Sequence, residues 1–596
     1  MHFPPLRFCQ VSILGFCVLI RLWNLKYEVY WLYTPLFDLA LKFGISNLEC
    51  CQSLRCRIGM KKHFENDGRR AGIKTGARFG GFHAHWVFSW LAAFTVLVLL
   101  HLPFLRLPYY WDEAGYYIPA AMDFLRSGQL IPGSTLPTGH TPLVIIYLAL
   151  AWRTFGFSPL VTRAAMILVA AGTLASVYTL GCRVANREVG CWSVLLLALS
   201  PLFFAQSVLA HLDLAAGLFT LLALWALVEG HPWRFALAAT CALLSKETAV
   251  VLLPVAGLFS WWQHRRAPGS PARAWWAACL VPLAALLAWV GFYHHATGFW
   301  TGNRQYLQYN VYSTLNPARV ILTLFRRLYE TFLGGFNWLL TAGALAGMRW
   351  RQGNRVRVAL ETPVIPAKVV PGYDRKTGIH SLFLLGGWLT VAYLLMLSLV
   401  GGAVLPRYLL PVFPPLALIA VILIRRLPRP LARSLMLFTA CCFVWAWFLN
   451  PPYPFPFEDN LAFADFIRVH EQAAHFLEAQ AGNRRILTAW PASDELAHPP
   501  LGYISRPLDV VAVEGFGRHD FDHVTPESFD CLYLYSRRWE PSSNGLRHFS
   551  WLQRLQERYF DYQPQIAEQE LAARYHLRLL TTYEKRRQWV KIYVRQ

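Results

Sequence analysis

The chain has 596 residues, of which 55% are hydrophobic and only 15% charged, and its mean hydropathy is +0.32. A soluble protein of this size would carry about 25% charged residues. Several apolar runs exceed about 18 residues, the length at which a helix becomes a candidate to span a membrane. Composition therefore excludes a soluble globular protein and predicts a polytopic α-helical membrane protein.

The formal net charge is +22, a value that suggests nucleic-acid binding when the charge lies on one surface. Here lysine and arginine gather in short loops between apolar runs, which is the pattern of cytoplasmic loops in membrane proteins. The twelve cysteines show no metal-ligand spacing, and Cys531 has no disulfide partner within its own segment. The sequence therefore predicts no nucleic-acid partner, no metal site and no cofactor.

Residues 1–85 are expected to precede the membrane region as an N-terminal extension. An apolar run, Val11–Trp23, contains Arg21 and has two interpretations, a signal-like segment or an extra membrane segment. We favour a third interpretation, in which translation starts at Met60. The stretch Met60–Arg78 then carries six basic residues against two acids and forms a cytoplasmic leader.

The membrane region is expected between residues 86 and 450. The positive-inside rule places the basic loops in the cytoplasm, which puts the N-terminus inside, the C-terminal segment outside and a long first loop, 106–158, on the external face. The runs between these loops predict eleven spans: 86–105, 159–181, 190–206, 213–229, 234–247, 248–262, 274–294, 320–347, 380–400, 408–424 and 433–449.

From Asn450 onward the composition changes. A proline-rich hinge leads to a polar segment with helical spacing, and short strand-like runs then alternate with helical stretches. This alternation over about 140 residues predicts a small external α/β domain at 451–596. Helices are predicted at 459–480, 546–559 and 565–575, and strands at 485–490, 507–513, 529–535 and 589–594.

The first loop begins with the sequence YYWDEAGYY, in which Asp112 and Glu113 directly follow the first predicted span. One interpretation is the start of a helix, because acids are favoured in a first turn. Carboxylates packed among aromatic rings at a membrane face are costly to desolvate, however. We therefore favour a functional role for the pair.

Two further charged groups interrupt apolar runs near the external face. Asp213 lies in a run where a carboxylate at the hydrocarbon centre would cost about 2.5–3.5 kcal/mol, and the alternative is an interfacial helix cap. Lys246 interrupts LLSKETAVVLLP next to Glu247. One interpretation is a self-compensating pair of these two residues, and the other is a lysine that binds an anionic ligand entering from the lipid.

Basic side chains also lie beside spans on the external side, against the inside bias. Arg163 opens the run at 159–181, and Arg407 precedes Tyr408 at the start of the run at 408–424. External arginines in such places suggest contacts with phosphate or lipid headgroups, although a single snorkelling arginine is common. His140, in TGHTPLVIIYLAL, is a further candidate for a substrate contact, although a lone histidine is usually structural.

The order and spacing of these residues resemble the GT-C glycosyltransferases of the ArnT and protein O-mannosyltransferase group. The likeness covers about residues 86–424: an Asp-Glu pair after the first span, a Pro-Leu segment about thirty residues later, SPLVTRAAMILVAAGTL, SPLFFAQSVLAHLDLAAGLFT, LLSKETAVVLLP and PRYLLPVFPPLALIA. The family often has Lys-Pro-Pro-Leu or His-Pro-Pro-Leu where this chain has His140-Thr141-Pro142-Leu143. Its Asp-Glu pair is more commonly followed by Ala-Arg-Tyr.

The resemblance implies a polyprenyl-phosphate-linked sugar donor and a catalytic aspartate in the first external loop, which by position is Asp112. The hypothesis is an inverting transfer to a lipid, glycan or protein acceptor at the periplasmic face of a bacterial inner membrane. Asp112 would act as the general base. The other candidates would contact the phosphate, the sugar or the acceptor: Glu113, Asp213, Lys246, Arg163, Arg407, Tyr408 and His140.

Two other functions fit part of the sequence. A transporter or flippase for a lipid-linked anion also explains many spans and lipid-facing cations, but it predicts an inverted internal repeat, and the sequence shows no repeat. A membrane scaffold that displays the C-terminal segment explains neither the acids nor Lys246. The enzyme is therefore the preferred hypothesis.

Overall fold

The computed structural model describes residues 80–266, 272–353, 375–451, 454–480, 482, 484–539, 550–560 and 565–596. The predictions made for residues 1–79, including a start at Met60, lie outside these residues. The chain divides into two compact units, 1–96 and 97–596. Helix α4 (Gly80–His101) runs across the boundary, and the description below concerns the second unit.

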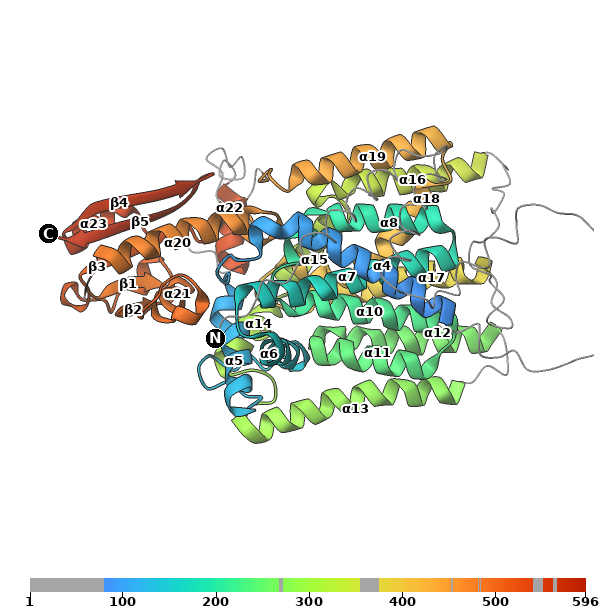
Figure 1. The fold of residues 1–596 in the computed structure, drawn as a ribbon, viewed down its shortest axis with the longest axis horizontal. Coiled ribbons are helices and arrows are strands. Elements are labelled where there is room, and N and C mark those ends of the chain that lie inside the picture. Colours follow the sequence, from blue (N-terminus) through green and yellow to red (C-terminus); the bar gives the residue numbers. More distant parts are fainter. Residues whose placement is uncertain are drawn as a thin grey trace, which may run out of the picture. The chain divides into compact units, whose positions relative to one another are not determined.

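Most of the second unit is helical. Many of its long helices run side by side as a bundle (Figure 1). The helices before the C-terminal region are α5 (Ile118–Ser127), α6 (Leu143–Phe155), α7 (Pro159–Val184), α8 (Arg187–Leu199), α9 (Pro201–Gln206), α10 (Leu212–Glu229), α11 (Pro232–Ser245), α12 (Leu252–Arg266), α13 (Ala272–Thr297), α14 (Arg304–Asn310), α15 (Pro317–Phe332), α16 (Asn337–Gly353), α17 (Arg375–Leu399), α18 (Phe413–Ile424) and α19 (Arg429–Ala446).

Local signals in the sequence set several of these helix ends. Ser158 caps α7 by accepting a hydrogen bond from the Val161 backbone at 3.3 Å, and Pro159 follows it at the first helical position. Asn186 caps α8 in the same way at 2.9 Å. Gly230 ends α10 in the left-handed region, with φ 74°.

Five helices among the described residues are long and apolar enough to cross a membrane: His85–Phe104, Pro159–Val184, Leu212–Glu229, Arg273–Thr297 and Thr377–Leu399. These helices support a multi-pass membrane protein. Two shorter apolar helices, α6 and α18, have 10–17 residues. The number of eleven spans stays a prediction.

The single span predicted at 320–347 is wrong. The structure has two helices there, α15 and α16, separated at Gly334–Phe336, where Gly335 and Phe336 have φ of 57° and 68°. Helix α15 is amphipathic, and its arginines turn toward backbone carbonyls of residues 402–405. The sequence predicts one span here because the apolar face of α15 continues into α16.

A break also divides the run at 190–206, where Pro201 begins the short helix α9 after α8. The two short runs predicted at 234–247 and 248–262 are separated as expected. Lys246 is extended there, with φ −156° and ψ 130°, and a 3₁₀ turn, Glu247–Val251, leads into α12. The polar residues SKE interrupt the helix because its backbone hydrogen bonding ends at Lys246.

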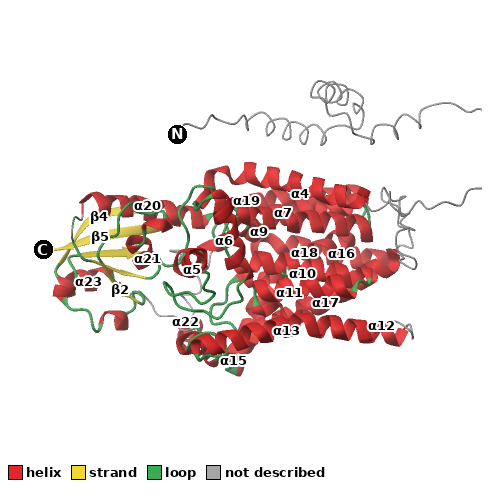
Figure 2. Cartoon of the chain, turned by 60° about the horizontal axis from the view of Figure 1, so that its bottom comes forward, coloured by secondary structure: helices red, strands yellow, loops and turns green. Residues whose placement is uncertain are grey.

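The C-terminal region forms a five-stranded sheet with the order β2-β1-β3-β5-β4. Strand β1 (Ile486–Ala489) pairs in parallel with β2 (Val510–Val513) and with β3 (Cys531–Tyr535). Strand β5 (Gln588–Arg595) pairs antiparallel with β3 and with β4 (Leu577–Lys585). The associated helices are α20 (Ala462–Gln480), α21 (Ala492–Ala497), α22 (Ser550–Tyr559) and α23 (Glu568–Tyr575). Figure 2 shows the strands side by side, with the C-terminus beside β4 and β5.

Four of the five strands lie where the sequence predicts them, and β4 was missed. Strand β4 lies at the edge of the sheet, and five of its nine residues are exposed, so it lacks the alternating apolar pattern of a half-buried strand. The sheet region contacts the first loop directly. Tyr109 donates its backbone N–H to the Leu501 carbonyl at 3.1 Å, and its own carbonyl accepts from the Tyr503 hydroxyl at 3.0 Å.

Candidate active site

A cavity of about 2160 Å³ lies between the helical region and the sheet region. Both regions contribute its walls, so residues far apart in the sequence face the same space. Of the side chains that the sequence predicted, the cavity is lined by Asp112, His140, Arg407 and Tyr408. Glu113, Arg163, Asp213 and Lys246 are not among its lining residues.

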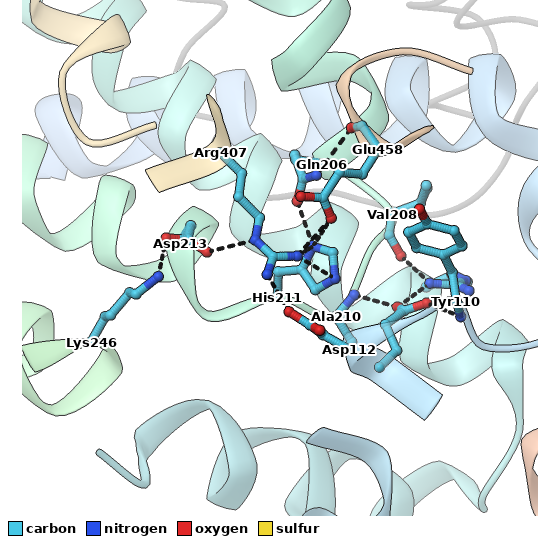
Figure 3. A network of polar contacts seen from close by, with 12 residues as sticks. Tyr110, Asp112, Gln206, Val208, Ala210, His211, Asp213, Lys246, Arg407 and Glu458 are labelled. Atoms are coloured by element: carbon cyan, nitrogen blue, oxygen red, sulfur yellow. Dashed lines mark hydrogen bonds and ion pairs between the residues drawn. The ribbon is translucent and has the colours of Figure 1, made fainter. Parts of the chain in front are cut away.

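Arg407 is the centre of the polar network at this cavity (Figure 3). Its guanidinium binds Asp112 through Nη2 and Glu458 through Nη1, the latter at 2.7 Å, and its Nε lies 3.5 Å from Asp213 Oδ2. The Arg407 side chain is 1% exposed. One buried cation therefore faces three carboxylates, and it hydrogen-bonds two of them, those of Asp112 and Glu458.

The backbone around Asp112 is unusual. Trp111 has φ 46°, a left-handed conformation that is rare for a bulky residue and is kept only where the surroundings impose it. A π-helical turn, Glu113–Tyr117, follows at once, and such turns are frequent at functional sites. The Asp112 side chain is 17% exposed and is the most accessible of the three carboxylates on Arg407.

Asp213 and Lys246 form a buried ion pair behind the cavity wall. Asp213 lies in the first turn of α10, and its Oδ1 accepts from Lys246 Nζ at 2.6 Å. The two side chains are 2% and 6% exposed. Lys246 Nζ also lies 3.8 Å from the centre of the Tyr408 ring, so the pair contacts two cavity-lining residues, Arg407 and Tyr408, without lining the cavity itself.

Glu113 points away from Asp112 and is buried against Arg163. Both side chains are fully buried. Glu113 accepts from Arg163 Nη1 and from the backbone of Tyr110 and Ala210, while Arg163 donates to the carbonyls of Val208 and Pro108 at 2.8 and 2.9 Å. The pair thus ties the first loop to α7 and to the segment before α10.

Breaking this pair should destabilise the protein. In Glu113→Gln the amide cannot compensate the buried Arg163 charge, and we expect a loss of about 3–5 kcal/mol in the free energy of unfolding. Thermal unfolding of the purified protein in nanodiscs checks this. The double variant Glu113→Gln/Arg163→Met should lose less stability than the sum of the two single changes, and additive losses would contradict the pairing.

His140 lines the cavity and is paired with Glu247. Its Nδ1 is 3.1 Å from both carboxylate oxygens of Glu247, and the two side chains are 16% and 37% exposed. The contact joins the loop before α6 to the break after α11. Glu247 therefore pairs with His140, and Lys246 pairs with Asp213, so Lys246 and Glu247 do not compensate each other as one interpretation of the sequence proposed.

Glu458 is a site residue that the sequence analysis missed. It follows the proline-rich hinge in a short turn, Phe457–Asp459, is 3% exposed and lines the cavity. His211 is a second such residue. It is fully buried, with Nδ1 2.7 Å from Gln206 Oε1 and its ring beside Arg407 Nη1. An acid directly after the last apolar run was the available signal for Glu458.

Burial raises the pKa of Glu458 to about 7 from its usual 4.5, with Arg407 opposing this rise and Asp112 and Asp213 adding to it. A raised pKa means that the folded state holds this proton more tightly than the unfolded state. The stabilising effect is present below pH 4.5 and is lost as the pH rises toward about 7.

The variant Glu458→Gln tests how stability changes with pH. Between about pH 4.5 and 7 the wild-type protein should lose stability relative to Glu458→Gln, because the glutamine has no proton to release. Melting temperatures of both proteins in the same nanodiscs across this range provide the measurement. Two parallel curves would show that Glu458 does not titrate differently on folding.

In the part of the chain that the structure describes, no group of three or more His, Cys, Asp or Glu side chains is arranged to hold a metal ion. The site instead contains fixed cations paired with carboxylates. Such a cluster suits proton transfer by a carboxylate and binding of an anionic group by arginine and lysine.

One family model and several solved structures are similar to this chain. The family model described as dolichyl-phosphate-mannose-protein mannosyltransferase matches residues 139–292. The crystal structure of ArnT from Cupriavidus metallidurans bound to undecaprenyl phosphate has 13% sequence identity and a TM-score of 0.50, over 85% of this chain and 98% of that chain. The same protein in the apo state matches with 13% identity and a TM-score of 0.49, over 86% and 98% of the two chains.

The archaeal oligosaccharyltransferase AglB from Archaeoglobus fulgidus has 12% identity and a TM-score of 0.42, over 73% of this chain and 65% of that chain. No curated protein sequence matches the chain. The matched family model and the fold shared with ArnT confirm the resemblance to the GT-C superfamily of membrane glycosyltransferases.

Proposed function

We propose that this protein is a glycosyltransferase that moves a sugar from a polyprenyl-phosphate donor to an acceptor hydroxyl at the external membrane face. The observation that carries the proposal is Asp112, a cavity-lining carboxylate that is paired with Arg407. Asp213 and Glu458 contact the same guanidinium. The ArnT structure of the same fold is described with undecaprenyl phosphate bound, which supports a donor of this class.

Asp112 acts as the general base. It takes the proton of the acceptor hydroxyl as that oxygen attacks the anomeric carbon, and the bond from that carbon to the donor phosphate breaks. A positioned base typically contributes about 10²–10⁴-fold to the rate. One displacement of this kind inverts the anomeric centre.

The leaving polyprenyl phosphate needs no protonation, so fixed cations supply the remaining stabilisation. Arg407 lines the cavity, and Lys246 lies behind it against the Tyr408 ring. Arg407 is the proposed contact of the phosphate, and Lys246 adds its positive charge from behind the cavity wall. Arg163 has a positioning role instead, because its guanidinium is buried against Glu113.

Glu113 and Asp213 also have positioning roles, because neither of them lines the cavity. Glu113 holds the first loop in place, and Asp213 holds Lys246 and Arg407 rather than lining the cavity. We therefore propose that both act through their partners. His140 and Tyr408, which line the cavity, remain proposed substrate contacts.

In this proposal the N-terminus is cytoplasmic, and the sheet region and cavity lie in the periplasm of a bacterial cell envelope. The distribution of basic loops supports this orientation. The donor then reaches the cavity laterally from the external leaflet.

Replacing Lys246 with alanine tests its contribution to phosphate binding. The change removes one positive charge near Arg407 and leaves Asp213 without its partner, so we expect donor binding to weaken about 10-fold, which is about 1.4 kcal/mol. The measurement is titration of the nanodisc-embedded protein with undecaprenyl phosphate. Lys591→Ala is the matched control, because Lys591 also pairs with a carboxylate at 2.6 Å but lies in the sheet region; equal affinities in the two variants would remove Lys246 from the site.

Mass spectrometry of lipids and surface glycans from cells with and without the gene tests the activity as a whole. Loss of one defined sugar addition is the expected result and identifies donor and acceptor together. A flippase would instead leave sugar transfer by the purified protein at zero while moving the lipid-linked donor across the bilayer, and that outcome would overturn the proposal.

A further inference from the structure

Three aromatic side chains lie together on the cavity wall beside Asp112. Trp111 and Tyr116 come from the first loop and Trp490 from the end of β1, and all three line the cavity and are half-buried. The Trp490 ring lies 5.6 Å from the Trp111 ring and 5.3 Å from the Tyr116 ring, centre to centre. We call these three residues the aromatic wall.

The aromatic wall is held firmly in place. A Cβ atom at Gly115 would lie 2.5 Å from the Trp490 indole, so the absence of a side chain there lets the ring rest on the backbone of the first loop. The Tyr535 hydroxyl donates to the Trp490 carbonyl at 2.6 Å. Trp111 keeps its left-handed conformation, which shows that its position is imposed by the surroundings.

Polar side chains surround the aromatic wall. Arg537 lies with its guanidinium carbon 6.0 Å from the Trp111 ring centre, and it lines the same cavity as Asp494 and Asp520. Aromatic faces together with a few placed carboxylates and a guanidinium are typical of a site for a small polar molecule with apolar patches. A sugar ring has this chemistry, because its C–H faces pack on aromatic rings while its hydroxyls bond to charged groups at the edge.

The aromatic wall and the proposed phosphate contact come from different parts of the chain. Arg407 and Tyr408 belong to the helical region, and Lys246 packs on the Tyr408 ring. Trp111 is the residue before Asp112, and its partner Trp490 belongs to the sheet region. A hydroxyl group bound at the aromatic wall would therefore lie beside Asp112 without occupying the proposed phosphate contact.

We infer that the aromatic wall is the acceptor subsite and that it binds a sugar ring, so that the acceptor is a glycan or the sugar portion of a glycolipid. This inference rests on the proposed glycosyltransferase activity and names its acceptor class. It also gives the sheet region a direct role in acceptor recognition. A peptide acceptor would instead be expected to pair with the edge strand β2, whose Ala512 and Val513 also line the cavity.

Binding of defined sugars to the full-length protein in nanodiscs tests the inference. The probes are methyl glycosides of common hexoses and N-acetylhexosamines, the same sugars attached to a short lipid, and a serine- and threonine-containing peptide, each followed by saturation-transfer NMR. At least one glycoside should bind the wild type. Equal binding of the free and lipid-linked forms indicates a glycan acceptor, and tighter binding of the lipid-linked form indicates a glycolipid.

Variants at the wall provide the decisive comparison. Trp490→Ala should weaken glycoside binding at least 10-fold, and Trp490→Phe should restore part of it, because the ring face is kept. Phe463→Leu is the matched control: Phe463 is a buried aromatic residue that contacts Tyr110 at the same junction but does not line the cavity. Its melting temperature and that of Trp490→Ala report whether either variant simply loses its fold.

Absence of glycoside binding to the wild type, binding of the peptide alone, or equal binding by Trp490→Ala and the wild type would overturn the inference. Binding needs no turnover, so this result is independent of the activity assay. Glycoside binding that depends on Trp490 in a protein that transfers no sugar would refute the proposed function and leave the subsite standing.

Discussion

Replacing Asp112 with asparagine should abolish sugar transfer. An amide of the same shape cannot accept the acceptor proton, and loss of a positioned base lowers the rate about 10²–10⁴-fold. The fold should survive, because Asp112 is the most exposed of the three carboxylates on Arg407 and an asparagine oxygen still accepts a hydrogen bond from the guanidinium. The rate of transfer by purified protein from a polyprenyl-phosphate sugar is the measurement.

The control for this experiment is Glu514→Gln. Glu514 is an exposed acid that lines the same cavity at the end of β2, so its replacement removes the same charge from the same space without touching Arg407. Transfer by this variant should stay close to wild type. Turnover near the wild-type rate in Asp112→Asn, with its melting temperature unchanged, would show that another group is the base.

Replacing Arg407 with alanine should reduce both stability and activity. The change leaves three carboxylates, those of Asp112, Asp213 and Glu458, facing one another without their shared cation. Removing one partner of a buried ion pair costs about 3–5 kcal/mol. Unfolding in nanodiscs should show a loss of this size, and transfer should be undetectable.

Two other variants keep this prediction testable when Arg407→Ala does not fold. Arg407→Lys keeps the charge but cannot contact three carboxylates with one planar fork, and we expect a folded protein with transfer reduced at least 10-fold. Arg183→Ala breaks a largely buried pair with Glu229 at 2.8 Å away from the cavity, and it should lose stability while keeping activity. Normal transfer by Arg407→Lys would refute a specific role for the guanidinium.

The two adjacent acids of the first loop show which features of the site the sequence predicts and which it does not. Both were expected at an external site, and both take part in buried networks. Because neighbouring residues in a helical turn point about 100° apart, only one of them can face the cavity. The structure places Asp112 there and turns Glu113 toward Arg163, a choice that no local pattern in YYWDEAGYY contains.

The sequence by itself determined the membrane class, the helix break at Lys246, four of the five strands and the segments that resemble GT-C glycosyltransferases. These features depend on composition, on the period of apolar residues and on short motifs, all of which are local. The tertiary structure alone decided the break between α15 and α16, the burial of Arg163 and the place of Glu458 on Arg407.

Asp112 and Arg407 are 295 residues apart, and Trp490 reaches the first loop from the sheet region. Contacts over such separations arise from how helices and strands pack rather than from any local preference, so only the folded chain could bring these groups to one cavity.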